Sequence, residues 1–168
     1  SRNGRRSSSL TRRSEGDSGE RVIMMNELSS SGSVPALEKL LSFAAQRQRL
    51  IAHNIANITT PDFRQSDVSV KDFQHSLRRA VLERRARTGG QAGELNMEDT
   101  REIKIGPGGG LILRPRTNGT GILAHDRNNR ELETLMKDLV ENASTFRLAS
   151  DLLKSRMDLL RAAISERV

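Results

Sequence analysis

The longest regular pattern of apolar residues runs over residues 131–165, where neither Gly nor Pro interrupts it. Apolar positions recur there at alternating spacings of four and three residues, which places them on one face of an α-helix. We therefore predict a long amphipathic helix within a C-terminal segment 131–168. The stripe consists of Leu132, Met136, Leu139, Ala143, Phe146, Ser150, Leu153, Met157, Leu160 and Ile164, of which Ser150 alone is polar.

A shorter stripe with the same spacing predicts an N-terminal helix over residues 34–59. Ser33 suits the N-cap, Pro35 suits the first turn, and Pro61 prevents continuation. The helix is the natural intramolecular partner of the C-terminal one, and we predict that the two pair antiparallel in a coiled-coil-like manner. The stripe consists of Leu37, Leu41, Ala44, Gln48, Ile51, Ile55 and Ile58. In an antiparallel pair, Gln48 is expected near the level of Ser150 and Leu153.

The C-terminal stripe is wider than a minimal coiled-coil seam, because Leu135, Val140, Leu152 and Leu159 flank it. One short helix cannot cover so much apolar surface, so we expect other subunits to cover the remainder. The predicted assembly seam consists of Leu37, Leu41, Ala44, Ile51, Ile55, Leu132, Met136, Leu139, Phe146, Leu153, Met157, Leu160 and Ile164.

The remaining segments have weaker patterns. Residues 1–33 are rich in Ser, Arg and Gly, which predicts a disordered extension. Residues 60–130 are predicted to be a loop or linker region, flexible or weakly β. Within it, residues 74–87 favour a short basic helix, and residues 101–105 and 111–114 favour a hairpin around a Gly-rich turn. The fold class is therefore mainly α, with two long terminal helices.

The amino-acid composition limits the range of possible functions. The 168 residues are 35% hydrophobic and 2% aromatic, and they include no Cys. Disulfides, Cys-type zinc sites and thiol catalysis are thus excluded, and apolar material for an enzyme pocket is scarce. We predict no catalytic residue, metal or cofactor. No apolar run suits a membrane span, and the N-terminus lacks a cleavable signal pattern.

The charge leaves one alternative open. The chain has 28 Lys and Arg against 21 Asp and Glu, a net charge of +7. A basic helical protein that binds nucleic acid is therefore a competing hypothesis. A solvated basic surface explains the same excess more simply, since aromatic residues and zinc-finger spacing are missing from the basic stretches.

A motif at the end of the first predicted helix reads HNIANITTPDF, from His53 to Phe63. Asn54 and Asn57 lie three residues apart, so their amides can bond the last-turn carbonyls or a neighbouring chain. Ala56 permits close helix approach, and Phe63 can fold back as an apolar staple. An ordinary helix end with asparagine caps would account for the same residues.

The motif resembles the N-terminal signature of flagellar axial proteins, A-N-[IL]-A-N-x-x-T-P-G-[YF]. The matching residues are Asn54, Ile55, Ala56, Asn57, Thr60, Pro61 and Phe63. Asp62 stands where Gly is usual, which makes a turn with positive φ less expected. The stretch from Asp126 to Glu133 resembles the family's entry to its last helix, with matches at Asp126, Asn128 and Glu131. The resemblance covers about residues 34–73 and 122–168.

The resemblance implies a non-enzymatic, structural subunit of the flagellar basal-body rod, located in the periplasmic part of the flagellum. It implies export by the flagellar type III apparatus, and polymerisation through the terminal helices into an axle that transmits torque. The implied partners are copies of the chain, other rod subunits, the membrane-ring base and the export apparatus, without nucleic acid or membrane insertion. The short loop after Pro61 favours the proximal, FlgB type of rod protein over the FlgC type, which remains an alternative.

Overall fold

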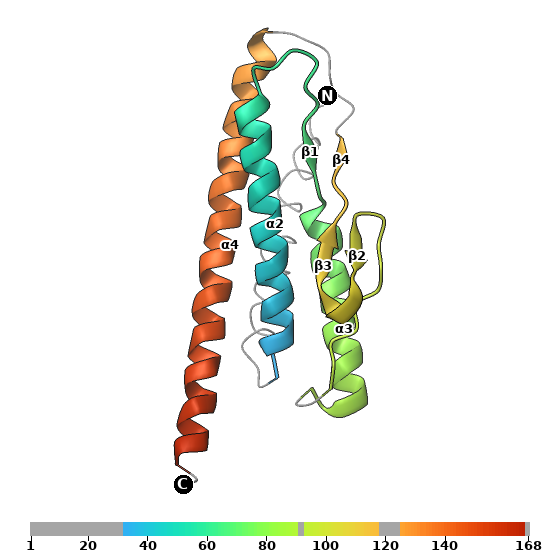
Figure 1. Ribbon diagram of the computed structural model, residues 1–168, viewed down its shortest axis with the longest axis vertical. Coiled ribbons are helices and arrows are strands. Elements are labelled where there is room, and N and C mark those ends of the chain that lie inside the picture. Colours follow the sequence, from blue (N-terminus) through green and yellow to red (C-terminus); the bar gives the residue numbers. More distant parts are fainter. Residues whose placement is uncertain (1–31, 91–92, 118–124, 167–168) are drawn as a thin grey trace, which may run out of the picture.

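The computed structural model describes residues 32–90, 93–117 and 125–166, with the backbone alone for residues 125–130. Three helices dominate it (Figure 1), which confirms the prediction of a mainly α fold. The predicted disordered extension, residues 1–33, lies outside the described residues except for Gly32 and Ser33. The elements are α2 (Val34–Asn57), β1 (Ser66–Asp67), α3 (Val70–Thr88), β2 (Ile103–Ile105), the 3-10 turn η1 (Pro107–Gly109), β3 (Leu111–Leu113), β4 (Arg116–Thr117) and α4 (His125–Ser165).

The two long helices lie side by side, and the chain runs along α4 in the direction opposite to α2 (Figure 1). The C-terminal end of α4 extends beyond the start of α2. Helix α4 begins at His125, six residues before the predicted start. Residues 125–130 are HDRNNR and carry no apolar stripe, so hydrophobic periodicity could not detect this first part of the helix.

The middle of the chain packs against α2 instead of forming the flexible linker that we expected. Phe73 of α3 stacks on Phe43 of α2 with ring centroids 3.9 Å apart, and Phe73 is fully buried. Leu77, Leu95, Met97, Ile103 and Leu111 complete the same cluster, together with Leu37 and Leu40 of α2 and Ala149 of α4. Helix α2 therefore lies between α4 and the middle of the chain, in contact with both.

The predicted hairpin is confirmed as the antiparallel pair β2–β3, in which Ile103 lies opposite Leu113. Gln46 of α2 binds the backbone of β3. The Gln46 Nε2 donates to the Leu111 carbonyl at 2.7 Å, and the Gln46 Oε1 accepts from the Leu113 amide at 3.2 Å. A second pair, β1–β4, joins Ser66 to Thr117 and was not predicted. Its strands have two residues each, too few for any alternating pattern.

The helix ends depend on capping groups. The short helix predicted over 74–87 is present as α3, which starts at Val70 because the Ser69 hydroxyl accepts from the Asp72 amide at 3.1 Å. It ends at Gly89, whose φ of 66° is left-handed. Ser33 precedes α2 but does not cap it through its side chain, since its own φ and ψ are helical. The Ser33 hydroxyl is buried without a hydrogen-bond partner.

Candidate assembly surface

The signature motif forms a clasp at the end of α2. Asn54 is 1% exposed; its Nδ2 donates to the Ser66 carbonyl at 2.7 Å, and its Oδ1 accepts from the Ser66 amide at 3.1 Å. The side-chain amide thus satisfies both backbone groups of the first residue of β1. Asn54 thus bonds the backbone of β1 and not a last-turn carbonyl, because the chain folds back onto α2 after the turn; a bond to a neighbouring chain stays a prediction.

The other signature residues shape the turn. Asn57 Nδ2 donates to the His53 carbonyl at 2.8 Å, which confirms the predicted bond to a last-turn carbonyl. The Phe63 ring meets the His53 ring edge to face at 5.6 Å, consistent with the predicted fold-back. Asp62 adopts a φ of 59°, so the turn keeps a left-handed residue, which the replacement of Gly had made less expected. Ala56, Thr60 and Pro61 are exposed, and Ile55 is half-buried.

A buried arginine connects three parts of the chain. Arg47 of α2 donates to both carboxylate oxygens of Asp67 on β1, at 3.1 and 2.8 Å, and its Nη2 lies 3.7 Å from Asp138 on α4. Burial alone would lower the pKa of Arg47, but the hydrogen bond and charge of Asp67, together with the charges of Asp138 and Glu141, outweigh it and the pKa is raised. Burial raises the pKa of Asp138, while Arg47 opposes this and Asp67 adds to it.

The contact between α2 and α4 has a different register from the predicted one. Asn142 Nδ2 donates to Gln48 Oε1 at 2.7 Å and to the Ala44 carbonyl at 2.8 Å. Gln48 was expected near Ser150 and Leu153, roughly 12–16 Å further along α4 at 1.5 Å per residue. The Ser150 hydroxyl instead donates to the Phe146 carbonyl of its own helix at 2.9 Å. A stripe that repeats every seven residues matches several registers equally well, so spacing alone could not choose among them.

The predicted seam residues divide between the interior and the surface. On α2, Leu37, Ala44 and Ile51 are buried and Leu41 is partly buried. On α4 the buried residues in the described part are Leu135, Asn142 and Ala149, so the covered line lies beside the predicted stripe. The seam residues Leu132, Leu139, Leu153 and Met157 flank this line and are half-buried.

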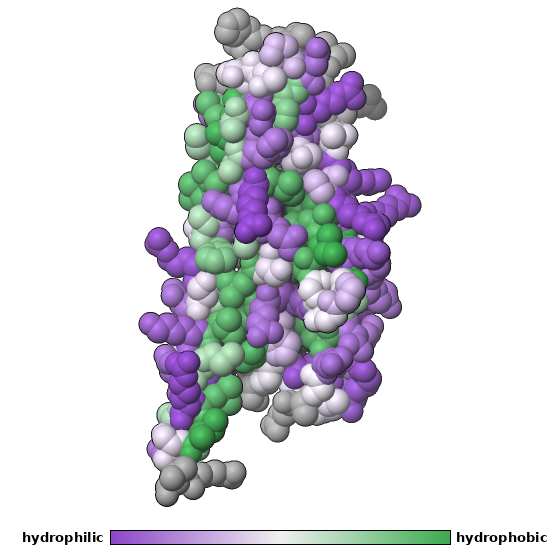
Figure 2. Space-filling model, viewed as in Figure 1, coloured by the Kyte–Doolittle hydropathy of each residue, from purple (hydrophilic) through white to green (hydrophobic). Residues whose placement is uncertain are grey.

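The remaining seam residues of α4 stay uncovered, as does the flanking Val140, and we call this set the outer stripe: Met136, Val140, Phe146, Leu160 and Ile164. Phe146 is 42% exposed and Ile164 is 69% exposed. Figure 2 shows the apolar surface extending along the molecule where α4 lies, down to its C-terminal end. A contiguous apolar strip on a helix is typical of a surface that binds another protein chain.

Among the described residues, a hydrogen bond joins Glu131, of the second part of the signature, to the segment that follows the first part. Gln65 Nε2 donates to Glu131 Oε2 at 3.0 Å, which links the segment after the clasp to the start of α4. The side chains of Asp126 and Asn128 lie outside the described residues. The assignment of the signature residues to assembly therefore remains a prediction.

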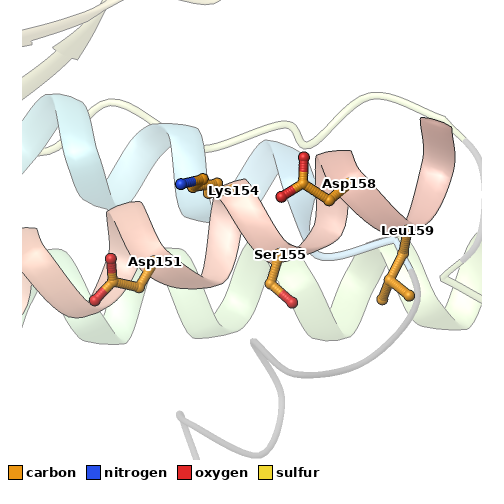
Figure 3. Close-up of a pocket in the computed structure, with 5 residues that line it drawn as sticks. All are labelled: Asp151, Lys154, Ser155, Asp158 and Leu159. Atoms are coloured by element: carbon orange, nitrogen blue, oxygen red, sulfur yellow. The ribbon is translucent and has the colours of Figure 1, made fainter. Parts of the chain in front are cut away.

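We searched the described residues for pockets, metal-binding clusters and membrane-spanning helices. A pocket on α4 is lined by Asp151, Lys154, Ser155, Asp158 and Leu159, all exposed residues of one helix (Figure 3). Across the described ranges, no group of three or more His, Asp or Glu side chains is placed to hold a metal ion. Nor does any helix among the described residues have the length and apolarity to cross a membrane.

Two long paired helices that leave apolar side chains exposed along one of them are typical of structural subunits that bind other chains. The comparisons identify the assembly. The chain is 31% identical to the flagellar basal body rod protein FlgB of Borrelia hermsii over 124 residues, which are 71% of this chain and 86% of the relative. It is 25% identical to FlgB of Proteus mirabilis strain HI4320 over 129 residues, 77% of this chain and 90% of the relative. No family model and no solved structure matches the chain.

The chain belongs to the FlgB family of flagellar basal body rod proteins. The resemblance to a rod protein inferred from the HNIANITTPDF motif is thereby confirmed, and the family places the chain in the flagellar basal body. A third relative, also named FlgB, is 37% identical over 71 residues. These three relatives favour the FlgB type over the FlgC type.

Proposed function

We propose that the chain is a structural subunit of the proximal rod, exported by the flagellar type III apparatus and assembled through α2 and α4 into the axle that transmits torque. The neighbours are copies of the same chain, other rod subunits, the membrane-ring base and, during export, the export apparatus. Membership of the FlgB family supports the role, and the open outer stripe supports the mode of assembly.

The pairing of α2 with α4 is part of the proposal, as an antiparallel coiled-coil-like pair. Leu135, Asn142 and Ala149 are buried at intervals of seven residues, which is the repeat of a coiled-coil seam. On α2, Ala44 and Ile51 repeat the same interval. The pair forms a stiff unit, and stiffness along the helix axis suits an element that transmits torque.

The outer stripe is the surface that we assign to the neighbouring subunit. Its residues are large and apolar, and burying them at about 25 cal/mol per Å² favours association. Part of that gain is offset by the entropy lost when a subunit is immobilised in the rod. Among the described residues, exposed large apolar side chains also occur at Leu148 and Leu159, on the opposite flank of the same helix. Helix α4 can thus contact neighbours on two sides.

The test introduces a charge into the outer stripe without disturbing the interior. Phe146→Asp and Ile164→Asp alter side chains that are exposed, so the purified variants should melt close to the parent chain. In cells that carry the variant as their only copy, we expect it to be exported but not incorporated, with loss of swimming in soft agar. Isolated basal bodies, probed for the chain, measure incorporation.

The matched control is Ser144→Asp, which adds the same charge to an exposed position of α4. It should leave motility and incorporation unchanged. Normal swimming by cells that carry only Phe146→Asp and Ile164→Asp together would contradict the assignment of the outer stripe. Failure of the parent chain to enter basal bodies would contradict the proposed function itself.

A further inference from the structure

Asn142 is the polar member of the buried line of α4 that faces α2, and Arg47 with Asp138, 3.7 Å apart, is a second polar link between the two helices. Of the buried α4 residues in the described part, Leu135 and Ala149 are apolar and Asn142, at 5% exposure, is not. A buried amide must be hydrogen-bonded to be tolerated in such a place. Asn142 meets this condition, because its Nδ2 donates to Gln48 Oε1 at 2.7 Å and to the Ala44 carbonyl at 2.8 Å.

Gln48, the residue of α2 whose side chain accepts this hydrogen bond, is also the polar member of an apolar line. Gln48 lies on a line of residues spaced by seven, with Leu41 before it and Ile55 after it. Both neighbours on that line are apolar, so Gln48 alone offers a side-chain acceptor at this face. The single polar residue of each line therefore meets the single polar residue of the other.

A displaced pairing would separate the two amides. If α4 moved by one heptad along α2, Asn142 would face Leu41 or Ile55, whose side chains cannot accept a hydrogen bond, so it would lose the Gln48 partner and be left with backbone carbonyls alone as acceptors. In one direction it would also enter the place of Ala149, inside the hydrophobic cluster that includes Leu37 and Leu40. A buried polar residue that is satisfied in only one alignment selects that alignment, as in coiled coils with one buried asparagine.

We propose that Asn142, through Gln48, is the positioning residue that sets the register of α4 on α2. It selects one alignment from those that the apolar repeats allow, and it thereby determines which α4 residues stay outside in the outer stripe. Hydrophobic burial supplies the attraction between the helices, and the amide pair supplies the choice of register.

The experiment measures register directly. The chain has no Cys, so Glu38→Cys on α2 and Lys137→Cys on α4, both at exposed positions, give a unique pair of spin labels. Their separation is measured by double electron–electron resonance. The parent chain should show one narrow distance. Asn142→Leu should add a second population, displaced along the helix by about 10 Å, which is the rise of seven residues.

The controls separate register from stability. Ser144→Leu places the same side chain at an exposed position of α4 and should keep the single distance. Gln48→Leu combined with Asn142→Leu should also show two distances, and it leaves no orphaned amide if the single variant folds poorly. Exchange of the two residues, Gln48→Asn with Asn142→Gln, keeps a polar pair and should restore the single distance.

A side chain that merely contributes to stability would change the melting temperature and leave the distance distribution unaltered. One narrow, parent-like distance in both apolar variants would overturn the proposal. Loss of folding in both would also count against it, because the argument requires the apolar repeats to pair without the amides.

Discussion

The contacts of Arg47 permit a paired prediction with one chemical change at two positions. Asp67→Asn and Asp138→Asn each remove one negative charge that faces Arg47, and neither alters the size of the side chain. Asp67 makes two hydrogen bonds to the guanidinium, at 3.1 and 2.8 Å, whereas Asp138 lies 3.7 Å away. The guanidinium itself is largely buried, with 8% of the side chain exposed. The two variants should therefore differ strongly.

The expected changes in the free energy of unfolding follow from these distances and exposures. Removing one partner of a fully buried ion pair costs about 3–5 kcal/mol. Asp67 is partly exposed and asparagine retains one acceptor oxygen, so we expect Asp67→Asn to lower the free energy of unfolding by about 2–3 kcal/mol. At about 2–4 °C per kcal/mol for a chain of this size, the melting temperature should fall by about 4–12 °C. The Asp138 contact resembles a partly exposed salt bridge, worth about 1 kcal/mol or less.

The effect of Asp138 on stability changes in size with pH. Its pKa in the folded chain is raised above the ordinary value of 3.8, so the folded chain binds the proton more tightly than the unfolded chain does. Ionised Asp138 therefore disfavours folding slightly at neutral pH, and this cost disappears as the pH falls through the folded pKa towards 3.8. We expect Asp138→Asn to be neutral or slightly stabilising at pH 7, with an advantage that shrinks on acidification.

The assay is urea unfolding of purified chains, followed by circular dichroism at 222 nm, at pH 7 and at several values down to pH 4. The two variants and the parent chain are compared at equal protein concentration. If Asp138→Asn destabilised the chain as much as Asp67→Asn at pH 7, our reading of the Arg47 cluster would be refuted. A growing advantage of Asp138→Asn on acidification would refute the sign of the pKa shift.

Three further substitutions test other parts of the structure. Asn54→Ala should cost about 1–3 kcal/mol and speed hydrogen exchange of the Ser66 amide, because both hydrogen bonds to Ser66 are lost; Asn54→Asp keeps the acceptor for this amide but sets a buried carboxylate against the Ser66 carbonyl, so it should be at least as destabilising; unchanged exchange in Asn54→Ala would argue against the clasp. Gly89→Ala should lower stability by about 1 kcal/mol in thermal melts, since φ is 66° and nothing lies within 4 Å of the added carbon, and a neutral result would contradict the left-handed cap. Phe73→Ala should cost about 3–5 kcal/mol in urea, because the ring is fully buried on Phe43, and a loss below 1 kcal/mol would rule out a packed middle.

The sequence predicted those features that a local pattern can carry. Helix α4 was detected because its apolar stripe persists over many turns, and the β2–β3 hairpin because alternating residues flank a Gly-rich turn. The stop after α2 followed from Pro61, which cannot continue a helix. The signature from Asn54 to Phe63 indicated the family, which the FlgB relatives then confirmed.

Other features required knowledge of which segments meet. Nothing near Arg47 in the sequence indicates that Asp67 and Asp138 will surround it, because these residues come from three separate elements. Asn142 had one detectable signal, a polar residue midway between Leu135 and Ala149 at spacings of seven. We had assigned the helix contact to the neighbouring stripe, in which Ser150 was the polar member, so this signal was missed.

By itself, the sequence determined that two amphipathic helices form at its ends and that they need apolar partners, because helical periodicity and proline act within a few residues. The tertiary structure decided how far α4 slides along α2, which side of its wide apolar stripe is covered, and that the middle joins the core. Those outcomes depend on hydrogen bonds and packing between residues distant in the chain, such as Asn142 with Gln48 and Asn54 with Ser66. Their free energies depend on the folded geometry, which no local pattern encodes.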